Sequence, residues 1–238
     1  MNTILFDLDG TLLPLDEKIF VDTYFDALHR TFEDKMDKKT FVNYIWGATA
    51  HMRDENDEER TNQELFMDKF ATFVGDEMDE YKERFDRFYE TGFLEVEKAV
   101  SKSQYVIDAI KLLKEKGYTI VLATNPLFPL TAVHHRIHWA GLQPEDFEHI
   151  TAYENSHYCK PYTAYYEEIL THIDKQPDEC MMIGNDVQED LVAGKLGLKT
   201  FLVENHLINR NNDTVDCTLR GNYEDLFEYV ASLPHVNG

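Results

Sequence analysis

The stretch that most constrains this chain lies in its first twelve residues. An apolar run from Ile4 to Phe6 leads into Asp7, Asp9 and the turn residue Gly10. Alternation along an extended strand sends both carboxylates to the same side. Two carboxylates at the end of a buried strand repel each other and lose hydration, so they are tolerated mainly when they share a cation or a proton. The pattern therefore favours a catalytic or cation-binding site at the end of this strand, although Asp-Gly is also a common turn pair.

After Ser103 the periodicity predicts alternating helices and strands. Strands are expected over 118–124, 150–152, 180–183 and 199–203, and the helices between and after them over 127–140, 161–173, 187–196 and 222–232. Repeated β-α units predict an α/β fold with a Rossmann-like, doubly wound parallel sheet and helices on both faces. In such sheets ligands bind beyond the carboxyl ends of the strands.

Residues 17–93 instead show a helical period throughout. Four apolar stripes predict four amphipathic helices in a small bundle, and the charge run 54–60 is expected to be a solvated loop. Because the first strand belongs to the same sheet as the later ones, we expect an all-helical domain over 16–100, inserted into an α/β core made of 1–15 and 101–238.

Three further motifs follow the two aspartates in order. Thr124 ends a predicted strand, Lys160 precedes a proline, and an acidic loop from Asn185 to Asp190 follows an apolar strand. Together the four motifs resemble those of the haloacid dehalogenase (HAD) superfamily and, within it, its Mg²⁺-dependent phosphatases. The resemblance covers nearly the whole chain, and it implies that the helical insertion is the family's cap.

The resemblance also implies roles in catalysis. Asp7 would be the nucleophile that forms an aspartyl-phosphate. Asp9 would protonate the leaving alcohol and then activate water, unless it serves the metal alone. Thr124, the backbone amide of Asn125 and Lys160 would bind the phosphoryl group, with the helix that follows Thr124 contributing its amino terminus.

By the same resemblance the cofactor would be Mg²⁺. Its ligands would be the carboxylates of Asp7 and Asp186 and the backbone carbonyl of Asp9, which are the hard oxygen donors that this ion prefers. Asp190 would act through water or through a neighbouring ligand, or it would simply favour the start of a helix.

The net charge and the cysteine content limit the kinds of partner and cofactor that we expect for this protein. The net charge is −22, from 23 basic and 45 acidic residues, which opposes binding to nucleic acid or an anionic membrane. Three scattered cysteines argue against a disulfide framework or a zinc site. No apolar run reaches the length of a membrane helix, and no basic leader precedes the first strand. We therefore expect a cytoplasmic protein, a monomer or weak dimer, that acts on a small phosphorylated metabolite.

Two other functions stay open. A phosphomutase of the same superfamily would keep both aspartates, but it would need cationic residues in the cap, where residues 15–100 hold 23 acidic against 12 basic side chains. A non-catalytic binding or regulatory protein could retain the fold, although it would need neither nucleophile nor acid.

Other residue patterns are explained by packing. His134 and His138 stand four apart on one predicted helix, but no third ligand accompanies them. Trp46, beside a break in the helical pattern at Gly47, is expected in the core, or with His51 and Arg53 near the leaving group. Three tyrosines at helical spacing are expected to pack against the sheet: Tyr162, Tyr165 and Tyr166.

Overall fold

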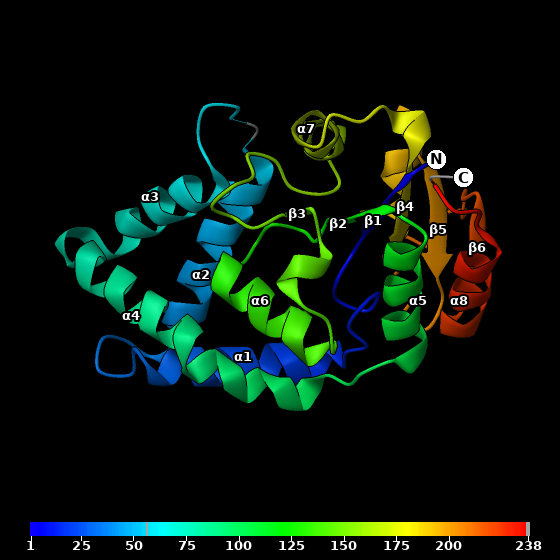
Figure 1. The fold of residues 1–238 in the computed structure, drawn as a ribbon. Helices are drawn as coiled ribbons and strands as arrows, with labels where there is room; N and C mark the ends of the chain where they lie inside the picture. The colour runs from blue at the N-terminus through cyan, green and yellow to red at the C-terminus, as the bar shows by residue number, and fades with distance from the viewer. Residues whose placement is uncertain (56, 237–238) are drawn as a thin grey trace.

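The sheet stands at the centre of the fold. The computed structural model describes residues 1–55 and 57–236. Six strands, all parallel, lie in the order β3-β2-β1-β4-β5-β6 (Figure 1). Their bounds are β1 Thr3–Phe6, β2 Thr119–Leu122, β3 His149–Ile150, β4 Cys180–Gly184, β5 Lys199–Val203 and β6 Leu219–Gly221. The chain moves outward from β1 on one side and then continues at β4 on the other, so the topological switch point lies between these two strands.

Helices cover both faces of this sheet, as expected. Ile4 and Phe6 of β1 belong to one buried cluster with the apolar sides of α5, α6 and α8. Leu5, which points the other way, belongs to a second cluster with α7. The bounds of these helices are α5 Gln104–Glu115, α6 Leu130–Trp139, α7 Thr163–His172 and α8 Tyr223–Ser232. The predicted α/β, doubly wound architecture is confirmed.

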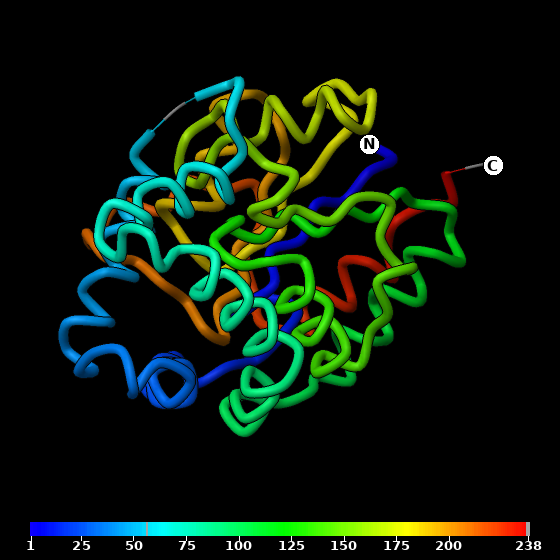
Figure 2. The backbone as a smooth tube through the Cα atoms, turned by 90° about the vertical axis from the view of Figure 1, so that its left-hand side faces the viewer, coloured from blue at the N-terminus to red at the C-terminus, as the bar shows by residue number. Residues whose placement is uncertain are grey.

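The segment between β1 and β2 contains the other long helices. Their bounds are α1 Glu17–Arg30, α2 Lys38–Asp54, α3 Asn62–Val74 and α4 Met78–Glu90, followed by the 3₁₀ helix Gly92–Ala99. The two ends of the segment lie side by side, because Leu15 forms an antiparallel bridge with Val100. In Figures 1 and 2 the light-blue and cyan helices α2 and α3 lie away from the red α8.

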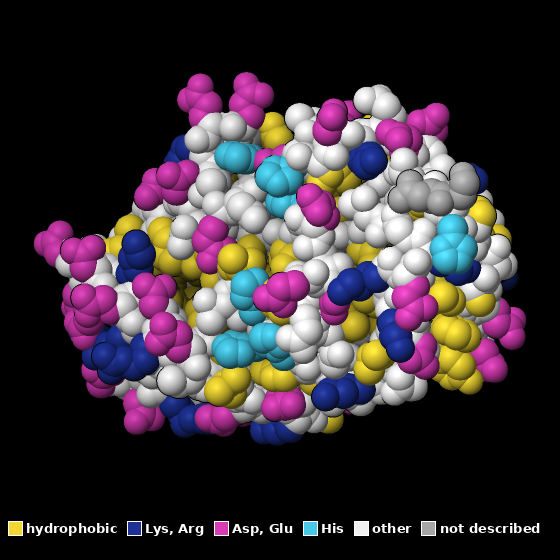
Figure 3. All heavy atoms as spheres, viewed as in Figure 1, with side chains coloured by type: hydrophobic (Ala, Val, Ile, Leu, Met, Phe, Trp, Pro, Cys, Tyr) yellow, Lys and Arg dark blue, Asp and Glu magenta, His cyan; other side chains and the backbone are white. Residues whose placement is uncertain are grey.

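An aromatic core fills the helical segment. Phe32 stacks on Phe41 and on Tyr81, with ring centroids 4.8 and 5.1 Å apart, and Phe85 packs against Phe70 at 5.2 Å. Acidic side chains cover much of its outer surface in Figure 3. Among the described residues, no helix is long and apolar enough to cross a membrane.

Several local predictions were wrong. Gly47 lies inside α2 and does not break it, and Pro161 precedes the Tyr162 cap of α7 and does not open the helix. Residues 187–196 form a loop and the 3₁₀ helix Leu191–Leu196, because the Asp186 carboxylate engages the backbone amides just after it. The short strand β6 was not predicted, since two of its three residues are exposed and show no apolar pattern.

Candidate active site

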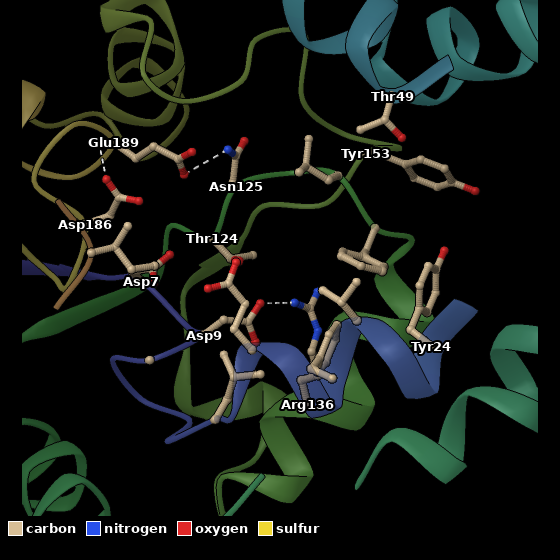
Figure 4. Close-up of a pocket in the computed structure, with 18 of the residues that line it drawn as sticks. Asp7, Asp9, Tyr24, Thr49, Thr124, Asn125, Arg136, Tyr153, Asp186 and Glu189 are labelled. Atoms are coloured by element: carbon tan, nitrogen blue, oxygen red, sulfur yellow. Dashed lines mark hydrogen bonds and ion pairs between the residues drawn. The ribbon is translucent and has the colours of Figure 1, made fainter. Parts of the chain in front are cut away.

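The predicted site residues gather beyond the carboxyl ends of the central strands. Asp7 follows β1, Thr124 and Asn125 follow β2, and Asp186 follows β4, and all four line one pocket. Figure 4 shows them together on one side of this pocket. The pocket therefore opens at the switch point, where parallel α/β sheets bind their ligands.

Lys160 lies behind this pocket and holds two carboxylates. Its Nζ donates to Asp7 Oδ1 at 2.9 Å and to Asp190 Oδ1 at 2.6 Å, and its side chain is 1% exposed. Burial alone would lower the pKa of Lys160, but Asp190 and Asp7 raise it well above its usual range. The lysine is thus a fixed cation. Among the described residues, Asp7 Oδ2 accepts no hydrogen bond, which leaves this oxygen available for reaction.

Burial strongly affects the two carboxyl groups bound to this lysine. It raises the pKa of Asp190 to about 7, against the opposing effect of Lys160. It also raises the pKa of Asp7, where Lys160 again opposes the shift and Asp9 and Glu189 add to it. Loss of hydration is the main cause of both shifts, and neighbouring carboxylates add to it.

Asp9 is held by a residue that the sequence interpretation missed. Arg136 of α6 forms an ion pair with Asp9 through Nη1 and Oδ2, and its guanidinium lies over the Phe128 ring, 4.6 Å from the centroid. Arg136 is 1% exposed and shares the buried face of α6 with Val133 and Ile137. An arginine on an apolar stripe was the available signal, because a buried guanidinium needs an anion.

Thr124 and Asn125 both line the pocket just after β2. The Thr124 carbonyl accepts hydrogen bonds from the hydroxyls of Thr151 and Tyr165, both at 2.7 Å. The Asn125 side chain donates to Glu189 at 3.0 Å and accepts from the Lys160 amide at 3.2 Å. Because α6 begins only at Leu130, no helix amino terminus follows Thr124 directly, and that part of the prediction was wrong.

The loop after β4 is built around Asp186. Its Oδ1 accepts the backbone amides of Gln188 and Glu189 at 2.9 and 3.0 Å, and its Oδ2 pairs with Arg210. Asp190 accepts the Asp186 amide at 2.9 Å, so it supports this loop from behind.

Neighbouring glycines allow the polar groups to approach closely. A Cβ on Gly10, where φ is +84°, would lie 2.4 Å from the Asn185 amide nitrogen. That side chain accepts from Thr11 at 2.9 Å and donates to the His206 carbonyl at 2.7 Å. A Cβ on Gly184 would lie 2.1 Å from an Asp190 oxygen. Each glycine is required because a side chain would displace these contacts.

The donors on this side of the pocket fit Mg²⁺. Among the described residues, no three His, Cys, Asp or Glu side chains form a cluster that could hold an ion by themselves. Mg²⁺ does not require one, since it usually keeps several waters and takes one or two carboxylates. Asp7 and Asp186 supply two carboxylates. Among the described residues, six acidic side chains line the pocket against two arginines, and a divalent cation would offset part of this negative charge.

The opposite side of the pocket is apolar. Figure 4 shows Tyr24, Tyr153 and Thr49 there, facing the acidic groups across the cavity. Trp46 also lines this side and is 51% exposed, so its prediction as a core residue was wrong, whereas His51 and Arg53 do not line the pocket.

The tyrosine prediction was right for two of three residues. Tyr165 and Tyr166 are fully buried beneath the sheet, and Tyr162 is 39% exposed.

Comparison with known proteins gives one consistent result. A family model described as a haloacid dehalogenase-like hydrolase matches residues 1–197. A pyrophosphatase PpaX from Bacillus cereus is 26% identical over 204 residues, which cover 85% of this chain and 83% of that protein. A HAD phosphatase from Thermococcus onnurineus has a similar structure, with a TM-score of 0.60, 18% identity and coverage of 99% and 100% of the two chains. An L-2-haloacid dehalogenase is also similar, with a TM-score of 0.58, 16% identity and coverage of 97% and 99%.

Proposed function

Because this chain belongs to the haloacid dehalogenase-like hydrolases, we propose that it is a Mg²⁺-dependent phosphatase that hydrolyses small phosphate monoesters through an aspartyl-phosphate on Asp7. The observation that carries the proposal is the Asp7 carboxylate, which lines the pocket at the switch point with one oxygen fixed by Lys160. Similarity to a pyrophosphatase also supports phosphate chemistry. Residues 16–100 would form the cap over this site.

The nucleophile and the acid have separate tasks in the first step. Asp7 Oδ2 attacks phosphorus, and the bond from phosphorus to the ester oxygen breaks as Asp9 gives that oxygen a proton. Arg136 fixes one side of the Asp9 carboxyl group, which restricts its direction. Thr124 would stabilise the phosphoryl oxygens as negative charge shifts toward the leaving group, while Lys160 holds the other Asp7 oxygen from behind the pocket.

In the second step Asp9, now a carboxylate, takes a proton from water. The resulting hydroxide attacks phosphorus, releases inorganic phosphate and restores the Asp7 carboxylate. Mg²⁺, held by Asp7 and Asp186, would supply positive charge that offsets repulsion between the phosphate and the acidic site. Asp190 would keep both Lys160 and the Asp186 loop in place.

Replacement of Asp7 tests the proposal. Asp7→Asn should abolish Mg²⁺-dependent release of nitrophenol from 4-nitrophenyl phosphate, because an amide cannot supply the attacking oxygen. Asp178→Asn, an exposed change at the opposite end of β4, is the matched control. Undiminished turnover by folded Asp7→Asn protein would refute the covalent mechanism.

Replacement of Asp9 tests the second role. Asp9→Asn should lower turnover of alkyl phosphates roughly 100-fold or more, and turnover of 4-nitrophenyl phosphate less, since nitrophenolate departs without a proton. Intact-protein mass spectrometry after acid quenching should then detect a phosphoryl group on Asp9→Asn and none on the variant that also carries Asp7→Asn. Equal losses for both substrates would instead indicate that Asp9 serves the metal alone.

A further inference from the structure

The pocket joins two walls of opposite character. Its volume is about 470 Å³, enough for a small organic molecule as well as a phosphate. The wall facing Asp7 and Asp186 comes from α1, α2, α3, α4 and the loop after β2, and it is largely aromatic. Six of its side chains carry the argument: Val21, Tyr24, Phe25, Trp46, Phe66 and Phe128.

The cationic side chains beside this aromatic wall are paired with carboxylates. Among the described residues, the arginines that line the pocket are Arg136 and Arg210, and each is paired with a carboxylate, Asp9 or Asp186. No lysine within 1–55 and 57–236 lines the pocket. His206 lies on the polar side, where a Cβ on Gly10 would come within 3.2 Å of its own Cβ and its ring centroid is 6.3 Å from that of Tyr223.

A second anionic group on the substrate would therefore meet no free cation. It would lose its hydration against aromatic rings, with Glu17 and Glu189 also lining the pocket. An apolar leaving group gains from the same surface, because its burial removes apolar area from water on both sides.

Two unpartnered atoms lie between the walls. Asp9 Oδ1 and Arg136 Nη2 are buried, and within 1–55 and 57–236 neither has a hydrogen-bond partner. Both atoms have almost no accessible surface, so they are closed to a ligand in this conformation. Asp9 itself lines the pocket, with its side chain 31% exposed, so the ester oxygen of a substrate would meet its carboxyl group and the group attached to that oxygen would continue toward the aromatic wall.

The tyrosine hydroxyls add little polarity. Tyr24 and Tyr89 bond to each other at 2.8 Å between their oxygens, and burial raises the pKa of Tyr24 to about 12. This pair stays uncharged and uses one of its two protons internally, which leaves one donor for the ligand.

We propose that the substrates are phosphate monoesters of uncharged alcohols that carry an aromatic or bulky apolar group, with at most a few polar substituents. This inference rests on the proposed phosphatase function and adds a substrate class to it. Pyrophosphate, bisphosphates and phosphate esters of hydroxycarboxylic acids should be poor substrates, because the pocket offers a second anionic group no unpaired lysine or arginine among the described residues.

Matched alkyl esters test the proposal. 2-Phenylethyl phosphate and ethyl phosphate release alcohols of similar acidity. The ratio of their kcat/KM values therefore reflects binding of the leaving group in the pocket and not the ease of breaking the ester bond. The phenyl ester should be favoured roughly 10- to 100-fold, the effect of burying one phenyl ring. The phosphate ester of 3-hydroxypropionate should be poorer than ethyl phosphate. Pyrophosphate should also be a poor substrate, although its leaving group departs more readily.

Two variants link the preference to the wall. Trp46→Ala should reduce the ratio between the phenyl and ethyl esters, whereas Tyr44→Ala removes an aromatic ring from the same helix outside the pocket and should leave the ratio unchanged. Val21→Lys should increase the relative kcat/KM of the carboxylate ester. Circular dichroism confirms that each variant is folded.

The outcomes separate this inference from the proposed function. Equal kcat/KM for the phenyl and ethyl esters, or a preference for pyrophosphate, would overturn the substrate class while leaving the phosphatase intact. If no ester is hydrolysed above the Asp7→Asn background, the phosphatase is refuted. In that case, binding affinities measured by calorimetry for the non-hydrolysable 3-phenylpropylphosphonate and propylphosphonate still test whether the pocket prefers an aromatic group. Tighter binding of the phenyl compound supports the aromatic site, and equal binding refutes it.

Discussion

Removal of the buried lysine should destabilise the protein strongly. Lys160→Met keeps a long unbranched side chain and deletes the charge that joins Asp7 to Asp190. The side chains of these carboxylates are 12% and 1% exposed, so water cannot replace the lost cation fully. Two carboxylates would then face each other in a buried space.

The magnitude follows from this burial. Breaking a buried ion pair by removing one partner costs about 3–5 kcal/mol. A chain of this length loses about 2–4 °C in Tm for each kcal/mol. The Tm of Lys160→Met should therefore fall by roughly 6–20 °C.

Thermal unfolding followed by circular dichroism, near neutral pH with a chelator present, measures this change. Lys111→Met is the matched control, because Lys111 is 74% exposed and lies 3.9 Å from Glu115. Addition of Asp190→Asn to Lys160→Met should restore part of the loss by removing one of the opposed charges. A Lys160→Met protein with the Tm of the control, or a double variant with no recovery, would refute this account.

Four further outcomes are expected. Arg136→Met should lower kcat toward 2-phenylethyl phosphate roughly 10-fold or more and affect 4-nitrophenyl phosphate less, because the proton donor Asp9 loses its anchor; steady-state kinetics with both esters would contradict this if the losses were equal. Lys116→Met should lower the free energy of unfolding in urea by about 1–3 kcal/mol. The Lys116 Nζ donates to three backbone carbonyls at the end of α8, those of Val230, Ala231 and Leu233, at 2.8, 2.7 and 2.6 Å. Burial, with a contribution from His172, lowers the pKa of His149 to about 4. Between about pH 6.5 and 4 the unfolded chain therefore binds a proton that the folded chain does not, so the stability of the protein falls as pH falls through that window. His149→Gln should make this fall shallower, and an unchanged slope of the urea midpoint against pH would contradict it. The kcat/KM for an anionic ester should rise as salt increases to about 0.15 M, because screening weakens repulsion from a chain of net charge −22; a fall would show that local cations dominate.

The strand ends could be predicted because short-range patterns encode them. Asp7 and Asp186 follow apolar runs, and parallel strands place such residues at one edge of the sheet. The prediction that these acids share a pocket therefore required no knowledge of side-chain contacts. Strand β5 even has the predicted bounds, 199–203.

Contacts between distant segments could not be predicted in the same way. The partners Asp9 and Arg136 are 127 positions apart, and nothing near either residue specifies the other. Trp46 was assigned to the core because of its apolar side chain, whereas its exposure depends on the cavity between two separate parts of the chain. Both errors concern tertiary packing, and both lie at the boundary where the leaving group would bind.

The pairing of charged side chains at the site explains how a polar, acidic wall and an aromatic wall can share one pocket. In the part of the chain that the structure describes, each lysine or arginine at the site already has a carboxylate partner: Lys160 binds Asp7 and Asp190, Arg136 binds Asp9, and Arg210 binds Asp186. These pairs orient the catalytic groups, but they leave little positive charge to attract a substrate over distance. A phosphate on an acidic protein must then gain its binding energy from short-range contacts, and the aromatic wall is the largest surface available for them. On this reasoning the apolar wall has two effects: it selects the leaving group, and it provides the attraction that the charges of the protein do not.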